Sequence, residues 1–142
     1  MAKTVATIVG VVFILVGLVG FFAHGLLGAH LSTAHNLVHL ISGAAALYFG
    51  TKGSLSAART FCLIFGAVYG LLGLVGFIAG KPGTPGISGM EGMGQDSRLF
   101  QVIPGILELG TMDHIIHILI GLLFLAGAFL TRTESEPAAA HR

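Results

Sequence analysis

The sequence predicts an all-α membrane protein, folded as a four-helix transmembrane bundle made of two duplicated two-helix hairpins. Composition is the first observation: 54% of the 142 residues are hydrophobic and 9% are charged, with a mean hydropathy of +0.92. In a soluble domain about a quarter of the residues are charged. The second observation is that four apolar runs each approach the roughly 20 residues that a spanning helix needs. Together they exclude a water-soluble globular domain, a disordered tail and a basic nucleic-acid-binding protein.

The four predicted spans cover residues 5–27, 34–50, 60–80 and 112–131. Short turns join them, except that residues 81–111 form a long outer connection whose first part is rich in Gly and Pro and typical of a flexible loop. The segment 99–110 is too short to span and is expected to cap the bundle at the outer interface. Residues 132–142 are expected to be a mobile polar tail. A chain of this length favours a single domain, so we expect residues 1–142 to form one transmembrane unit.

An internal repeat relates the two hairpins. The strings VHLISG and IHILIG align His39 with His117 and Gly43 with Gly121. The first and third spans also share glycines at matching positions. Because the first span takes part in this repeat, and because it is longer than the roughly 7 to 15 residues of a signal-peptide core, we expect it to be structural rather than cleaved. Each unit has two spans, so the halves should be parallel repeats about an axis along the membrane normal.

Glycine stripes predict how the helices pack. At about 100° per residue, the glycines of the third span fall on one helix face, and three glycines of the first span repeat part of that face. Small residues let helix backbones approach closely in lipid. We therefore expect the stripes to pack helices inside the bundle rather than to form a homodimer face. The glycines concerned are Gly10, Gly17, Gly20, Gly66, Gly70, Gly73, Gly76 and Gly80.

Basic residues near the span ends predict the orientation, because they favour the cytoplasmic side. With the N-terminus inside, two basic residues, Lys81 and Arg98, lie outside. The cytoplasmic ones are Lys3, Lys52, Arg59, Arg132 and Arg142. This asymmetry predicts a multi-pass protein of the cytoplasmic membrane with both termini cytoplasmic. The lipid bilayer is then the partner that the sequence implies, and a net charge of +1 gives no support for nucleic acid or another anionic partner.

Histidine placement is the feature that bears on function. Six of the seven histidines lie at the outer ends of the spans under this topology. On the second span His35 and His39 are four residues apart, and on the fourth span Asp113 and His117 have the same spacing, with His114 beside them. This spacing places two side chains one above the other on a helix, which suits two ligands of one metal or a histidine oriented by a carboxylate. Ionisable groups at membrane depth usually mark a functional site.

Two interpretations of this cluster are a structural network and a ligand site. In the network, His39 and His117 hydrogen-bond to Asn36, Asp113 and Glu108, the last held over the cluster by the outer segment. In the ligand site, His39 and His117 bind a haem or a chlorophyll-type pigment from two sides, or the cluster binds a transition metal. The residues available to a metal are His35, His39, Asp113, His114 and His117.

A proton relay or ion path through Asp113, His117 and Glu108 is the third interpretation. Neither a Cys-based metal pattern nor a complete HExxH motif occurs, and there is no phosphate-binding Gly loop. An enzyme is therefore expected only if it depends on a metal or cofactor. The favoured function is a non-enzymatic accessory or structural subunit of a larger membrane complex. The alternative is a small transporter or proton-coupled membrane protein.

The strings AHNLVHLISG (residues 34–43) and MDHIIHILIG (residues 112–121), set in four Gly-rich spans, resemble an uncharacterised bacterial four-helix integral membrane family, a domain of unknown function. The resemblance extends over residues 5–130. Its motif positions fall on Asn36, His39 and Leu40 and on Asp113 and His117, with Ile118 departing from the pattern. The resemblance implies a protein of the bacterial inner membrane and brings no established activity.

Overall fold

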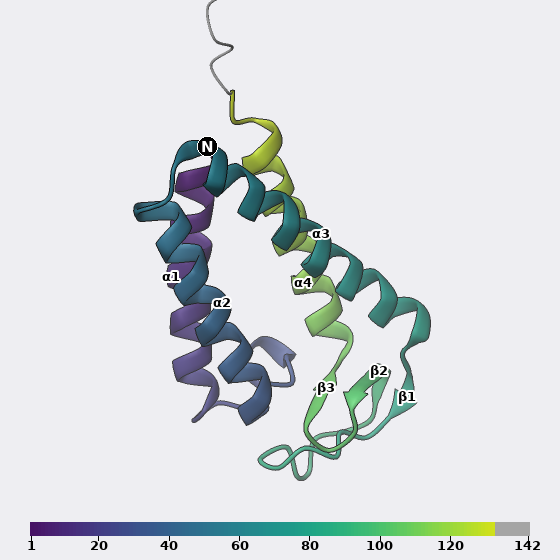
Figure 1. The fold of residues 1–142 in the computed structure, drawn as a ribbon. Helices are drawn as coiled ribbons and strands as arrows, with labels where there is room; N and C mark the ends of the chain where they lie inside the picture. The colour runs from purple at the N-terminus through teal and green to yellow at the C-terminus, as the bar shows by residue number, and fades with distance from the viewer. Residues whose placement is uncertain (133–142) are drawn as a thin grey trace, which may run out of the picture.

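Residues 1–132, which this computed structural model describes, form four long helices, a short 3₁₀ turn and a small sheet. Figure 1 shows α1 and α2 side by side as one pair and α3 and α4 as a second pair, with the sheet at the end of the molecule far from the N-terminus. Apart from Arg132, the predicted polar tail lies outside the described residues. The helices are α1 (Ala2–Gly20), α2 (Thr33–Thr51), α3 (Leu55–Ala79) and α4 (Thr111–Phe129).

Three of these helices, α1, α3 and α4, are long and apolar enough to cross a membrane. Helix α2 has 19 residues, as many as α1, but it does not reach the same apolarity because its first half carries His35, Asn36, His39 and Ser42. The fold is thus mostly helical with three candidate spans. That α2 also spans stays a prediction.

The first helix is shorter than predicted. It ends at Gly20 instead of continuing to residue 27, and the chain then forms a loop that contains the 3₁₀ turn η1 (Leu26–Gly28). Leu27 and Gly28 both have positive φ, 56° and 78°, a conformation that cannot continue a helix. The apolar residues of this loop extended the predicted span, because apolarity alone does not distinguish a helix end from a loop. The loop brings His30 against the start of α4.

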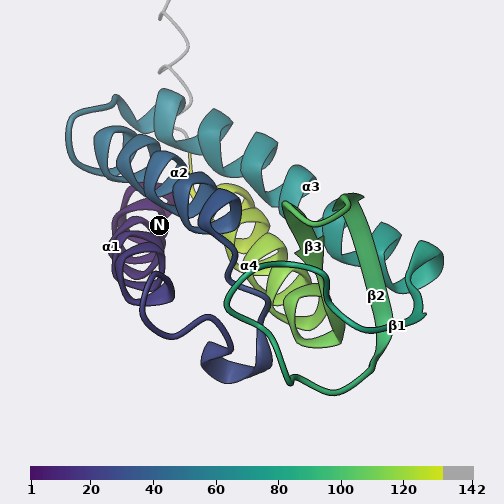
Figure 2. The same ribbon diagram turned by 90° about the horizontal axis from the view of Figure 1, so that it is seen from below.

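The sequence predicted a flexible loop for the first part of the outer connection. The structure shows that the connection also contains a three-stranded antiparallel sheet of order β1-β2-β3. Its strands are β1 (Lys81–Gly83), β2 (Asp96–Ile103) and β3 (Leu107–Leu109). Between β2 and β3 the chain reverses through Pro104 and Gly105, whose φ of 75° and the bond from Ile106 N–H to the Ile103 carbonyl are typical of a type II turn. Figure 2 shows the sheet and the η1 loop together at one end of the helices.

The two helix pairs share one packing pattern. A Cβ added to a glycine of α1 would meet a residue of α2, and a Cβ added to the matching glycine of α3 would meet the repeat equivalent of that residue in α4. The two helices of each pair are therefore equally close to each other at these positions. These matched contacts are Gly10 with Leu47 and Gly66 with Leu125, Gly17 with Leu40 and Gly73 with Ile118, and Gly20 with Asn36 and Gly76 with His114. Gly80 lies against the Arg98 carbonyl, whereas a Cβ on Gly70 would have open space.

The apolar core lies between the two pairs, from the end near the N-terminus to about the middle of the helices. Phe13, Phe61, Tyr69 and Phe124 pack there against small residues such as Ala46 and Ala128. The direct contacts are dense within each pair and thinner between the pairs. The opposite half of the bundle therefore has room for polar side chains between the pairs.

Candidate metal centre

Three buried histidines meet where the two helix pairs face each other. His35 and His39 lie one turn apart on α2, and His117 comes from α4. One ligand nitrogen from each of the three lies within 4.8 Å of the others. The ring of His35 is the central one, with its centroid 4.4 Å from that of His39 and 5.7 Å from that of His117. We call His35, His39 and His117 the histidine triad.

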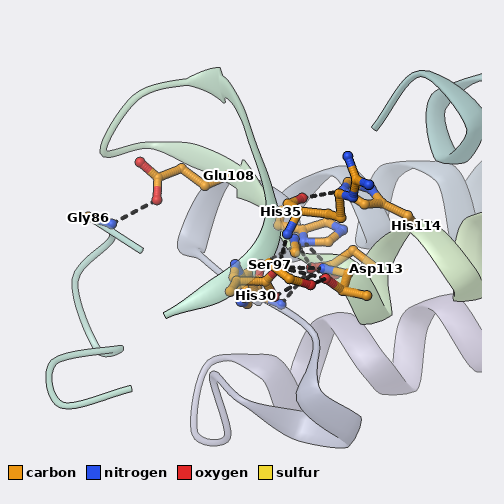
Figure 3. Close-up of polar contacts among 11 residues, drawn as sticks. His30, His35, Gly86, Ser97, Glu108, Asp113 and His114 are labelled. Carbon is orange, nitrogen blue, oxygen red and sulfur yellow. Dashed lines mark hydrogen bonds and ion pairs between the residues drawn. The ribbon is translucent and has the colours of Figure 1, made fainter. Parts of the chain in front are cut away.

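The orientation of His35 is set by hydrogen bonds from outside the triad. Its Nδ1 lies 2.8 Å from the His30 carbonyl, so Nδ1–H donates to that oxygen and Nε2 is the ring nitrogen left for another partner. His30 is held in turn by Asp113, whose Oδ2 accepts its backbone N–H at 2.9 Å and that of Gly110 at 2.7 Å. Figure 3 shows these contacts converging at the start of α4. Asp113 therefore caps α4 and positions His35 through His30.

The other two rings of the triad have polar atoms without hydrogen-bond partners. The Nδ1 atoms of His39 and His117 are buried and pair with no group among the described residues. Phe13 stacks on His39 with the centroids 5.2 Å apart, and Tyr69 meets His117 edge-on at 5.4 Å. A buried polar atom left unpaired costs about 1–3 kcal/mol. A bound cation would recover part of this cost.

His114 points away from the triad, toward α3. Its Nε2 lies 2.7 Å from the Arg98 carbonyl, and its ring packs against Gly76 and Phe77. His114 joins α4 to strand β2 at this contact. Of the five residues that the sequence offered to a metal, the structure brings together His35, His39 and His117, while Asp113 supports the triad from behind and His114 lies apart.

Glu108 does not lie over the histidine cluster. Its buried carboxylate accepts the backbone N–H groups of Gly86 and Gly105 and the side-chain amide of Gln101, at 2.7 to 2.8 Å. Figure 3 shows Glu108 on the side of the sheet away from the histidines. Burial is the largest influence and raises the pKa of Glu108, but these hydrogen bonds together outweigh it and leave the pKa below its ordinary value. Glu108 thus fastens the β2–β3 turn to the loop after β1.

A second carboxylate ties the sheet to α4. Asp96 accepts hydrogen bonds from the backbone N–H and the hydroxyl of Thr111 and from the N–H of Arg98. Burial raises its pKa most, yet these bonds prevail and the pKa lies below the ordinary value. Asn36 is likewise separate from the triad, because it packs against Gly20 and its Nδ2 donates a long bond of 3.4 Å to the Leu31 carbonyl. The polar network that the sequence suggested is therefore divided into several local sets.

Two apolar cavities adjoin the triad, and both are lined by His39 and His117. The larger, about 270 Å³, lies between α2 and α3 under the sheet and is also lined by His35. The smaller, about 150 Å³, lies between α1 and α4 beside the η1 loop. The triad thus stands between two small spaces.

A sequence model of the family described as Domain of unknown function (DUF4383) matches residues 3–96, more than half of the chain. The chain belongs to this family. This match confirms the predicted resemblance to a family of unknown function. The matched segment is shorter than the predicted one and ends before Asp113 and His117. His35 and His39 lie inside it. No curated protein and no solved structure matches the chain.

Two residues of the site were not found by sequence reasoning. Tyr69 lies beside His117, and the His30 carbonyl fixes His35. The repeat offered a signal for Tyr69, because it occupies in α3 the position of Phe13 in α1. Nothing local in the sequence indicated that the His30 carbonyl would face α2.

Proposed function

We propose that this is a small four-span protein of the bacterial cytoplasmic membrane whose histidine triad binds a divalent transition metal ion such as Zn²⁺. The observation that carries the proposal is the convergence of three buried imidazoles from two helices, with ligand nitrogens within 4.8 Å of one another. Zinc binds imidazole nitrogen at about 2.0–2.1 Å, so small side-chain rotations would bring the three nitrogens to one ion. Three histidines leave a fourth coordination position open.

The surroundings of His35 favour a metal. Metal-binding histidines commonly donate their second ring N–H to a carbonyl or carboxylate, which fixes the ring. His35 makes such a bond to His30, and Asp113 supports His30. Neutral imidazole nitrogens also suit zinc, copper, iron and nickel better than hard cations.

A metal ion accounts for the geometry better than a haem or a chlorophyll-type pigment. A macrocycle held by His39 and His117 needs a flat open space between the two rings. The ring of His35 lies beside both of them, and the cavities of about 270 and 150 Å³ flank the rings instead of separating them.

The metal would act on the assembly of the bundle. The triad joins α2 of the first pair to α4 of the second, at the end where direct contacts between the pairs are thin. A ligand present at 100 times its Kd stabilises a fold by about 2.7 kcal/mol. We therefore favour a structural or accessory role, as a subunit of a larger membrane complex, with both termini on the cytoplasmic side.

Proton-coupled transport through Asp113, His117 and Glu108 has less support. Glu108 accepts three hydrogen bonds within the sheet region, and Asp113 is engaged as a helix cap. Asp113 keeps Oδ1 free, 3.9 Å from His35 Nδ1, but Glu108 lies apart from the histidines, so the three residues do not form a continuous path.

Equilibrium dialysis of the detergent-purified protein against Zn²⁺ tests the proposal. We expect one ion per chain, and at least a tenfold weaker affinity for the His39→Ala and His117→Ala variants. His114→Gln is the matched control, because glutamine keeps a donor for the Arg98 carbonyl and should bind zinc like the wild type. Absence of stoichiometric zinc, or equal binding by all four proteins, overturns the proposal.

A further inference from the structure

The two cavities beside the triad are repeat equivalents of each other. One is formed by α2 and α3 and the other by α4 and α1, and most of their helical lining residues are repeat equivalents, whereas the sheet completes the first and the η1 loop the second. The matching residues are Val68 and Val12, Leu72 and Val16, Val38 and Ile116, and His39 and His117, each of these last two lining both cavities. The duplicated hairpin has therefore produced the same space twice, and the differences between the two copies are informative.

Polar groups distinguish the larger cavity. Tyr69 stands where the smaller cavity has Phe13, and Ser42 stands where it has Ile120. The larger cavity thus has two hydroxyl groups that the smaller one lacks, and it has His35 where the smaller one has Asp113. The Tyr69 hydroxyl is buried, on a residue that is 4% exposed, and the Ser42 hydroxyl lies beside it, although the two do not reach full hydrogen-bond geometry among residues 1–132. Burying such a group is unfavourable unless something pairs with it, so the hydroxyl points to a ligand.

The walls indicate the form of the ligand. Five of the lining side chains are planar rings, namely those of His35, His39, Phe65, Tyr69 and His117. Aromatic side chains favour stacked or edge-on contact with another flat ring. At about 270 Å³ the cavity lies near the lower end of small-molecule pockets, roughly 300–1,000 Å³, so it suits a single ring and not a macrocycle.

The rim indicates where the ligand comes from. Val38, Val68 and Val102 line the cavity and are 44%, 55% and 41% exposed, so the space is bordered by apolar surface between α2 and α3. In a membrane-embedded bundle that surface faces lipid. A ligand entering here would be dissolved in the bilayer.

We propose that the cavity between α2 and α3 binds the ring of a membrane-dissolved quinone, with a carbonyl oxygen accepting the Tyr69 hydroxyl. The flat ring lies among the aromatic side chains, the hydroxyls of Tyr69 and Ser42 supply donors for its oxygens, and the alkyl chain leaves between α2 and α3 into lipid. This site shares His35, His39 and His117 with the triad, but it does not require the metal, because its hydroxyl groups and its aliphatic walls are not metal ligands.

Calorimetric titration of a decyl-substituted benzoquinone into the purified protein, treated with EDTA, tests the site. We expect one binding site per chain, at least tenfold weaker binding by Tyr69→Phe, and none by Ser42→Ile, which fills the space as Ile120 fills its counterpart. Tyr48→Phe is the matched control and should bind like the wild type, because Tyr48 lies on the exposed surface of α2. Tyr69→Phe retains the ring, so its melting temperature should stay close to that of the wild type.

Three results overturn the proposal: no binding to the wild type, equal binding by Tyr69→Phe, or equal affinity for decylbenzene, which keeps the flat ring and the alkyl chain without the oxygens. The last would identify a nonspecific hydrocarbon site. Since the titration uses metal-free protein, its outcome is separate from that of zinc dialysis.

Discussion

Replacing Gly73 by alanine should loosen the pair formed by α3 and α4. A Cβ at this position would lie 2.6 Å from the His114 carbonyl oxygen and 3.0 Å from the Ile118 backbone nitrogen. Both are backbone atoms of α4, so the contact is relieved only if the helices move apart. Inserting a methyl group into a well-packed interior typically costs about 1–3 kcal/mol. At the roughly 4 °C per kcal/mol expected for a chain of this size, the melting temperature should fall by about 4–12 °C.

Gly70 supplies the matched control. It lies one turn earlier on α3, and a Cβ there would meet no atom within 4 Å. Alanine also favours a helix over glycine by about 1 kcal/mol in water, so Gly70→Ala should be neutral or slightly stabilising. The assay is thermal unfolding in detergent, followed by circular dichroism, with size-exclusion chromatography to record oligomeric state.

Equal melting temperatures for the Gly73→Ala and Gly70→Ala variants would refute the packing argument. A loss of dimer with no loss of helix stability in Gly73→Ala would instead assign the stripe to a homodimer face. In the bundle interpretation the oligomeric state of the two variants is the same and their stability differs.

Three further predictions concern the polar groups. The Asp113→Ala substitution removes both the cap of α4 and the support of His30. Zinc binding measured by dialysis should therefore weaken about 10–100-fold. Wild-type affinity in this variant would argue against indirect positioning of His35. Because hydrogen bonds hold the pKa of Glu108 below its ordinary value, its contribution to stability is present above the unfolded-state pKa of about 4.3 and is lost as pH falls through the lower folded-state value. The hydrogen-exchange protection factors of residues 81–109, which compare the observed rate with the intrinsic rate at the same pH, should therefore fall between about pH 5 and pH 3, and unchanged protection factors would contradict this. EDTA added to zinc-loaded protein should lower the melting temperature of the wild type but not that of His39→Ala, and an equal decrease in both would place the metal elsewhere.

The helices were predictable because their signals are local. Apolar runs and glycine spacing identified α1 to α4, and the repeat aligned His39 with His117. The end of α1 was wrong because most of Phe21 to Leu27 is still apolar, so apolarity did not mark the end of the helix at Gly20. The sheet was missed because β1 and β3 have three residues each and β1 pairs with a strand that follows a long loop, although the Pro104–Gly105 turn between β2 and β3 was a readable signal.

The site was predictable only in part, for a similar reason. Spacing along α2 placed His35 and His39 on one face, and the repeat added His117. Spacing alone could not show that His117 and not His114 belongs to the triad. The two side chains lie on different faces of α4, and what each face contacts depends on which helix packs against it. Glu108 was placed over the histidines by its position in the chain, whereas three donors in the sheet region hold it elsewhere.

Whether the histidine triad binds one ion is tested most directly with Co²⁺, because its visible absorption reports how it is coordinated. Titration of Co²⁺ into metal-free wild-type protein should produce visible ligand-field absorption that saturates at one ion per chain and is displaced by Zn²⁺. The same titration of the His39→Ala and His117→Ala variants should give no such band, while His114→Gln should behave like the wild type. No band from the wild type, or the same band from all four proteins, would contradict the central claim.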